Sequence, residues 1–233
     1  MTLVVFVRCQ DGCVLVGDRK ATDHLGYGEE ESKLKVFSRG WAMGGAGDLD
    51  PIRKLFSKLD EEDVTLDSLE QIIAETFREY CNLQDAEVSC ILLKAQNQSV
   101  EAEIIEASST TGDSGKRAVG LTPPIPIGSP FKCIGEVPGK IVASHYLKKK
   151  DYGAMACEQA APEILAIMKQ ASKEGSYVGR QEEFGFDVLL VKNGTYSLRP
   201  RETTEYVILT SEYSLVNGVS AQFNYTQFEN GGV

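Results

Sequence analysis

The chain has few of the residues from which many enzyme sites are built. It contains only two histidines, His24 and His145, which lie far apart in the sequence. A catalytic triad that uses histidine as its base therefore has little support, and so does a metal site with several histidine ligands. We expect neither a metal ion nor a cofactor.

Acidic residues outnumber basic ones, 34 to 24, and long apolar runs are scarce. The net charge of −10 and the pI near 4.8 argue against a surface that binds nucleic acid. No apolar run approaches the ~18–20 residues that a membrane helix requires. No positively charged segment leads into an apolar one, as in a secretory signal. We therefore expect a cytoplasmic protein that binds neither nucleic acid nor a membrane.

The cysteines show no pattern of their own. There are six, at positions 9, 13, 81, 90, 133 and 157. Their spacing is neither that of paired metal ligands nor that of a disulfide framework. Because cytosolic chains rarely keep structural disulfides, we expect the cysteines to be reduced and buried thiols.

What the chain does have is enough apolar material for a sizeable core. It has 233 residues, of which 42% are hydrophobic, and this length is common for one domain. No internal repeat or linker divides it. We predict a single domain over residues 1–233, with a loose tail from about residue 224, where the sequence is polar and contains glycine.

The first segment of the chain is the most informative. Residues 3–7 form a continuous apolar run, which is typical of a strand that is buried on both faces. Asp11-Gly12 separates this run from a second one and predicts a hairpin turn, because both residues accept positive φ. The residue before the first strand, Thr2, is therefore anchored at the start of a core strand.

Thr2 carries a possible chemistry. Methionine ahead of a small residue is normally removed, which would give Thr2 a free α-amino group beside its hydroxyl. Such a threonine can act as nucleophile with its own amine as base, since an α-amino group has a pKa of ~7.7–8.0. The alternative is an ordinary frayed terminus.

The surrounding motifs favour the first interpretation. The runs TLVVFVRCQDGCVLVGDRKAT, KLKVF and WAMGGAGDLD resemble the start of proteasome β-type subunits and their bacterial relatives, the N-terminal-threonine (Ntn) hydrolases. The motifs match from Thr2 to about Asp50, and beyond this only the layout is similar. The chain is thus identified as a divergent relative of that family.

The resemblance implies a set of catalytic residues. Thr2 would be the nucleophile, Lys35 the lysine beside it, and Asp18 the carboxylate that holds the lysine. Gly47 would supply the backbone N–H that stabilises an oxyanion. A protonated lysine beside the hydroxyl would lower the pKa of that hydroxyl. For an arbitrary Asp–Lys pair, a surface salt bridge is the alternative.

The residues alone do not decide which lysine would lie beside the nucleophile. Lys33-Leu34-Lys35 can be aligned with the family in either way. We predict Lys35, because it directly precedes Val36-Phe37 as the family lysine precedes its apolar pair. Strand alternation does not decide, since residues two apart share a face.

The resemblance also implies substrate-binding residues. These are Ala21 and Thr22 in the cleft, Gly47, and Gly45, which falls where the family sets the depth of its specificity pocket. A glycine at Gly45 implies an open pocket. The alternative for this glycine-rich segment is a bend or close sheet packing.

The rest of the chain alternates between blocks of strands and helices. Helical patterns cover residues 52–59, 69–80, 138–148 and 152–171, and strand patterns cover residues 88–93, 102–105, 131–134, 187–191, 196–198 and 205–209. This order is typical of two sheets packed between helical layers. It matches the α+β fold of the family, a four-layer αββα sandwich with two antiparallel sheets between helical layers.

Two segments depart from the family pattern. Glu136 stands where the family has a serine in a Gly-Ser-Gly turn, and Val178 stands where it has a second serine. Both family serines belong to the surroundings of the nucleophile. Changes of this kind commonly retune chemistry.

Three functions follow from this sequence. The first is a threonine peptidase that forms an acyl ester on Thr2 and hydrolyses it. The second is a transpeptidase or protein ligase that passes the acyl group to an amine, as in some archaeal relatives, the connectases. The third is a non-catalytic assembly subunit that retains Met1. The resemblance further implies a peptide or unfolded-protein substrate and a homo-oligomer, such as a ring, and leaves any ATPase partner unidentified.

Overall fold

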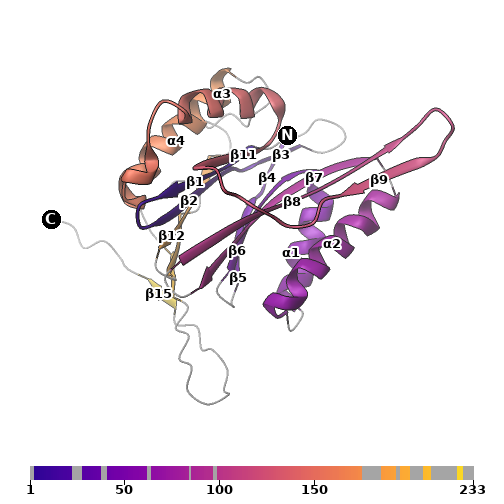
Figure 1. Cartoon of the computed structure of the whole chain (residues 1–233), viewed down its shortest axis with the longest axis horizontal. Coiled ribbons are helices and arrows are strands. Elements are labelled where there is room, and N and C mark those ends of the chain that lie inside the picture. Colours follow the sequence, from indigo (N-terminus) through magenta and orange to yellow (C-terminus); the bar gives the residue numbers. More distant parts are fainter. Residues whose placement is uncertain are drawn as a thin grey trace, which may run out of the picture.

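Two antiparallel β-sheets lie face to face between two pairs of helices, so that the molecule has four layers (Figure 1). The computed structural model describes residues 3–22, 28–37, 41–61, 64–83, 85–96, 99–174, 185–192, 195–199, 207–210 and 225–227. The predicted αββα sandwich is confirmed.

The first sheet has the strand order β11-β1-β2-β12-β13-β14-β15. Its strands are β1 (Leu3–Cys9), β2 (Gly12–Asp18), β11 (Phe131–Gly135), β12 (Phe186–Lys192), β13 (Thr195–Arg199), β14 (Val207–Thr210) and β15 (Tyr225–Gln227). β15 lies within the predicted tail and pairs with β14; residues 224 and 228–233 of that tail lie outside the described residues.

β1 confirms the prediction of a strand buried on both faces. Leu3 and Val5 pack into the cluster on the helical side of the sheet, whereas Val4 and Phe6 pack into the cluster between the two sheets. All four side chains are fully buried. The continuous apolar run in the sequence therefore reflects a strand with a core on each face.

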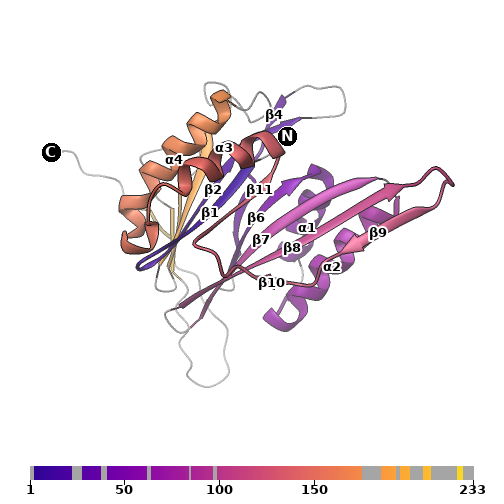
Figure 2. The ribbon, with the colours of Figure 1, turned by 45° about the horizontal axis from the view of Figure 1, so that its top comes forward.

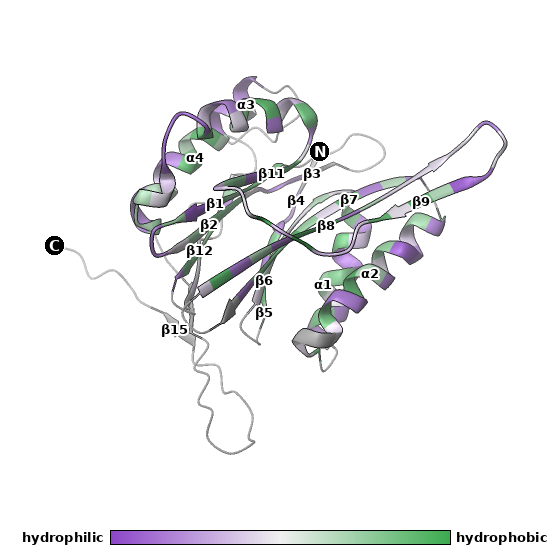
Figure 3. Ribbon diagram, viewed as in Figure 1, coloured by the Kyte–Doolittle hydropathy of each residue, from purple (hydrophilic) through white to green (hydrophobic). Residues whose placement is uncertain are grey.

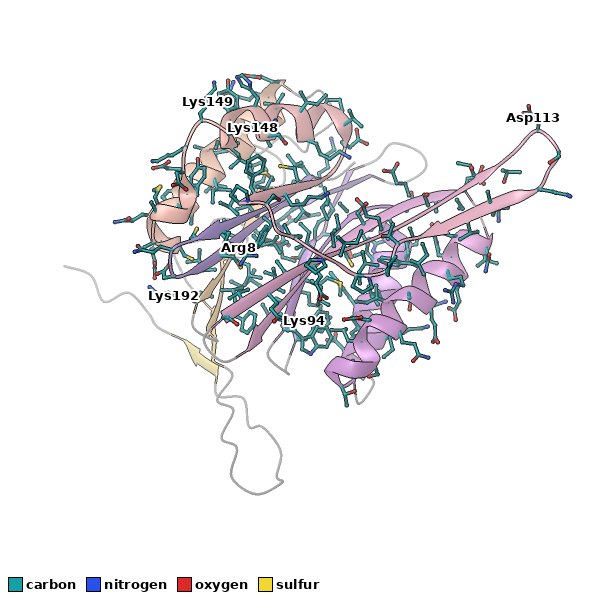
Figure 4. The ribbon with its side chains drawn as sticks, in the orientation of Figure 1. Arg8, Lys94, Asp113, Lys148, Lys149 and Lys192 are labelled. Carbon is teal, nitrogen blue, oxygen red and sulfur yellow. The ribbon has the colours of Figure 1, made fainter. Side chains whose placement is uncertain are left out.

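The second sheet has the order β10-β8-β7-β6-β5, with β9 paired to β8. Its strands are β5 (Leu34–Phe37), β6 (Trp41–Gly47), β7 (Ala86–Gln96), β8 (Ser99–Thr111), β9 (Arg117–Leu121) and β10 (Ile125–Pro126). The β8–β9 hairpin extends away from the rest of the molecule, with Asp113 near its tip (Figure 4). A separate small sheet consists of β3 (Lys20–Thr22) and β4 (Gly28–Glu30).

Each sheet has its own pair of helices on its outer face (Figure 2). These are α1 (Leu49–Glu61) and α2 (Leu66–Leu83) on the second sheet, and α3 (Val137–Leu147) and α4 (Cys157–Glu174) on the first. A short 3-10 helix, η1 (Tyr152–Ala154), precedes α4. The helices mix hydrophobic and hydrophilic residues, whereas the central strands are largely hydrophobic (Figure 3). None of the described helices is both long and apolar enough to cross a membrane.

Chain direction in the first sheet brings three ends together. β1 pairs antiparallel with β2 and with β11, so its first residue lies beside the ends of both neighbours. Leu3 is opposite Gly135, and Val4 is opposite Gly17. The start of β1 is therefore surrounded by the residues that end β2 and β11.

The six cysteines are free thiols, as predicted. Five of them are buried, and Cys133 is partly exposed.

Candidate active site

Asp18 is the residue that ties β2 to the start of β1. Its side chain is fully buried, and its Oδ1 atom accepts a hydrogen bond of 2.8 Å from the backbone N–H of Leu3. Thr2 itself lies outside the described residues. The bond nevertheless places the Asp18 carboxylate at the residue that directly follows Thr2.

The other oxygen of this carboxylate has a different environment. Oδ2 of Asp18 is buried and has no hydrogen-bond partner within the part of the chain that the structure describes. Since a buried polar atom without a partner is costly, this oxygen is an acceptor that a further donor would stabilise.

Lys33 is the cation of the site. Its side chain is only 1% exposed, and its Nζ atom donates to the carbonyl oxygen of Lys20 at 2.5 Å. Nζ also lies 3.4 Å from both the Oδ1 and the carbonyl oxygen of Asp18. Burial lowers the pKa of Lys33, and the negative charge of Asp18 opposes this shift.

The predicted pairing of Lys35 with Asp18 is wrong. The Lys35 ammonium instead pairs with Asp60 of α1. It also lies 5.6 Å from the ring centre of Phe37 and 5.7 Å from that of Phe56. Lys35 is therefore part of the contact between the second sheet and its helices.

The two lysines pack against different parts of the molecule. Lys33 lies just ahead of β5 with its side chain against Asp18 of β2, whereas the Lys35 side chain lies against α1. Gly17 of β2 allows the approach, since a Cβ atom there would lie 3.1 Å from the Leu34 side chain. The segment that carries Lys33 is thereby packed directly on β2.

Gly47 ends β6 in a conformation that requires glycine. Its φ is +103°, and an added Cβ atom would lie 2.1 Å from the carbonyl oxygen of Glu87. The next residue, Asp48, donates its backbone N–H to the same oxygen at 2.9 Å. Gly47 is exposed, and it carries no side chain of its own that could cover its backbone. Its use as an oxyanion donor remains a prediction.

The structure describes only one of the other predicted substrate-binding positions, Gly45, in enough detail to compare it with the prediction. Ala21 and Thr22 belong to β3, and their side chains lie outside the described ones. The open pocket inferred at Gly45 is wrong, because an added Cβ atom would lie 2.9 Å from Cγ2 of Ile52 in α1. The space that a side chain at Gly45 would take is filled by Ile52.

Glu136 lies at the same end of the first sheet. It follows Gly135, which is opposite Leu3 and has a φ of +110°. Burial raises the pKa of Glu136, and the nearby negative charges of Glu87 and Asp18 raise it further. The second departure from the family pattern, Val178, lies outside the described residues.

Sequence reasoning missed a polar network beside Lys33. The buried carboxylate of Asp187 accepts from the Arg19 guanidinium at 2.6 and 2.8 Å and from the Ser32 hydroxyl at 2.5 Å. Nε of Arg19 donates to Glu30 at 2.9 Å. The one available signal was a charged residue inside an apolar strand pattern, at the start of β12.

No group of three or more metal-ligating side chains lies together among the described residues. The polar groups described above are carboxylates, the Lys33 ammonium, the Arg19 guanidinium, the Ser32 hydroxyl and backbone amides. They are suited to proton transfer and to the stabilisation of an oxyanion.

The four layers, with two antiparallel sheets between two pairs of helices, match the fold of the Ntn hydrolases. Two similar solved structures are Anbu and a mutant of Anbu, both from Hyphomicrobium sp. strain MC1. The mutant is 14% identical, with a TM-score of 0.58, over 85% of this chain and 86% of that chain. Anbu itself is 14% identical, with a TM-score of 0.57, over 90% of this chain and 88% of that chain.

At this level of identity, the likeness to Anbu shows the fold alone. No protein-family model and no curated protein matches this chain.

Proposed function

We propose that this chain is an N-terminal-threonine peptidase of the proteasome-like type, formed by one Ntn-hydrolase domain. The observation that carries the proposal is the position of Asp18. One of its oxygens contacts both Leu3, the neighbour of Thr2, and the buried Lys33. A nucleophile–base site at Thr2 needs such a fixed pair of charges.

In this proposal, Lys33 takes the role that the sequence alone had favoured for Lys35. The Lys33 ammonium lowers the pKa of the Thr2 hydroxyl by its charge, and Asp18 holds the ammonium. Oδ2 of Asp18, which has no partner among the described residues, is the acceptor for a donor at Thr2. Gly47 offers its N–H to the oxyanion.

The chemical step follows from these roles. The hydroxyl proton of Thr2 moves to the α-amine of Thr2 while its Oγ atom bonds to the substrate carbonyl carbon. The C–N bond then breaks, and the proton goes to the leaving amine. Water reverses these steps at the acyl ester and frees Thr2.

A second function keeps the same acyl ester but transfers it to an amine. The observation that favours it is Glu136, a partly buried carboxylate with a raised pKa that adjoins Gly135. An incoming ammonium group must be bound and must lose a proton before it attacks. In this second function Glu136 does both, which the serine of the resembled family is less suited to do.

We further propose that the protein is a cytoplasmic homo-oligomer, such as a ring, that acts on peptides or unfolded proteins. Two large apolar side chains on α3 support association, since Val137 is 60% exposed and Ile141 is 65% exposed. Light scattering during size-exclusion chromatography gives the mass of the assembly. A monomer at all concentrations would contradict this part of the proposal.

Peptide turnover tests the function. We expect cleavage of members of a fluorogenic peptide library by the wild type, none by Thr2→Ala, and residual cleavage by Thr2→Ser, which keeps a hydroxyl nucleophile. Mass spectrometry with an added acceptor peptide separates the two functions, because ligation gives a joined product whereas hydrolysis does not. Equal cleavage by Thr2→Ala would remove Thr2 from the mechanism.

A further inference from the structure

Asp187 is a buried carboxylate that the proposed chemistry does not use. It is the second residue of β12, it is opposite Gly17 in the pairing of β12 with β2, and its side chain is fully buried. Its two oxygens accept from the Arg19 guanidinium and its Oδ2 also accepts from the Ser32 hydroxyl. Asp187 thus joins two segments that are separate in the sequence.

Each of these partners directly precedes a residue of the Lys33 contact. Arg19 precedes Lys20, whose carbonyl oxygen accepts from Lys33 Nζ at 2.5 Å. Ser32 precedes Lys33 itself. One carboxylate therefore anchors both the segment that carries the donor and the segment that carries the acceptor.

The two segments are also joined through the backbone. The N–H of Glu31 donates to the carbonyl oxygen of Arg19 at 2.8 Å. β3 and β4 continue this contact as an antiparallel pair, with Lys20 opposite Glu30. Each of these neutral backbone bonds is weaker than the charge-assisted bonds of Asp187 to Arg19. We therefore expect the carboxylate to add to the alignment that the backbone pairing provides, since it also holds Ser32, the neighbour of Lys33.

Arg19 has a second carboxylate partner, which offers a matched control. Glu30 of β4 accepts from Nε of Arg19 at 2.9 Å, and its side chain is 30% exposed, against 1% for Asp187. A more exposed partner contributes less, because water and salt screen it.

We propose that Asp187 is a positioning residue, which fixes the Lys33 ammonium against the carbonyl of Lys20 by holding Arg19 and Ser32. Its importance for catalysis rests on the proposed function, in which Lys33 acts at Thr2. Its effect on Lys33 itself does not.

The charges that face Lys33 set the direction of the expected change. Asp18 of β2, Glu31 ahead of β5 and Asp187 of β12 each raise the pKa of Lys33, against the larger lowering by burial. Removal of the Asp187 charge therefore lowers the pKa of Lys33 further. Loss of the alignment adds to this, because the ammonium then loses an acceptor.

The experiment measures the pKa of Lys33 by NMR in protein with isotope-labelled lysine. The Lys33 signal is assigned by its absence in Lys33→Arg. We expect a lower Lys33 pKa in Asp187→Asn, a smaller decrease in Ser32→Ala, and no change in Glu30→Gln. Labelling of Thr2 by a β-lactone should slow on the order of tenfold or more in Asp187→Asn, with a shifted pH profile.

Each outcome decides a separate claim. A folded Asp187→Asn with an unchanged Lys33 pKa overturns the positioning role, even if the enzyme is active. If Asp187→Asn does not fold, Ser32→Ala decides, and an unchanged Lys33 pKa there overturns the proposal. If the wild type neither cleaves peptides nor reacts with the β-lactone, the proposed function fails, whereas the Lys33 pKa still tests the role of Asp187.

Discussion

The ammonium nitrogen of Lys33 lies 3.4 Å from the Oδ1 atom of Asp18, and both side chains are buried. The same Oδ1 atom holds the backbone of Leu3. A buried charge without a partner is strongly destabilising, so these two residues depend on each other. Together they bring a fixed cation and a fixed anion to the start of β1.

Substitution of each lysine tests which one serves the site. We expect Lys33→Met to slow the labelling of Thr2 by a β-lactone on the order of 10²–10⁴-fold. Lys35→Met should have little effect, because Lys35 contacts α1. The rate is measured by mass spectrometry against time. The reverse order of effects would show that Lys35 is the catalytic lysine after all.

Lys33→Met also leaves the Asp18 carboxylate buried without its cation. We expect a loss of about 3–5 kcal/mol in the free energy of unfolding. The double variant Lys33→Met/Asp18→Asn removes this uncompensated charge and should recover part of the loss. Urea titration measures both, and it separates a failure to fold from a loss of chemistry.

Gly47→Ala tests the need for a bare backbone at the end of β6. The new Cβ atom would overlap the carbonyl of Glu87, and alanine would also be strained at a φ of +103°. Gly115→Ala is the matched control, because its φ is +72° and no atom of the described residues lies within 4 Å of the added one. Gly115→Ala should lower the free energy of unfolding by about 1–2 kcal/mol. Gly47→Ala should lower it by more and should abolish the labelling of Thr2 by the β-lactone. An equal loss of stability in the two variants would show that the structure shifts to relieve the overlap at Gly47.

Gly45→Ala tests whether Ile52 closes the predicted pocket. The added methyl group meets Ile52 at 2.9 Å, so we expect a loss of about 1–3 kcal/mol from overpacking. In an Ile52→Ala background, which already has a cavity, Gly45→Ala should lower the free energy of unfolding by less, or should raise it. A double-mutant cycle by urea unfolding measures the coupling. Wild-type stability of Gly45→Ala would indicate free space at this position.

Asp11 gives a prediction for pH. Burial raises the pKa of Asp11, but Lys192 and the N–H of Cys157 outweigh it and lower the pKa from 3.8 to about 2. Because the folded pKa is depressed, the stabilisation is complete above pH 3.8 and is lost as the pH falls toward 2. After allowance for solvent screening, we expect Asp11→Asn to lower the free energy of unfolding by about 1–2 kcal/mol at pH 7.

The difference in the free energy of unfolding between the wild type and Asp11→Asn should shrink from pH 4 to pH 2. Urea unfolding at several pH values measures it. Lys192→Met is the control, since it removes the cation that contacts Asp11 at 2.7 Å. A difference that stays constant with pH would show that the ion pair does not stabilise the fold.

The layers of the fold were predictable because their signals are local. The apolar run of β1 and the Asp11-Gly12 turn each follow from neighbouring residues, and the structure has both. β9 was not predictable in this way. Its residues are largely exposed, so the strand is formed by pairing with β8 and has no apolar pattern of its own.

The candidate site was predictable only in part. Asp18 and Gly47 lie at strand ends that the sequence marks, whereas the choice between Lys33 and Lys35 depends on which of them packs against β2. The filling of the space at Gly45 depends on Ile52 in another layer. Asp187 reaches Arg19 across 168 positions of sequence. These contacts are set by tertiary packing, which no local pattern encodes.

The most direct test of the central claim is the intact mass of the protein after exposure to a threonine-reactive β-lactone. We expect a wild-type protein without Met1 that carries one covalent adduct, and a Thr2→Ala protein that carries none. A wild-type protein that retains Met1 and has no adduct, or an equal adduct on Thr2→Ala, would contradict a nucleophile at Thr2.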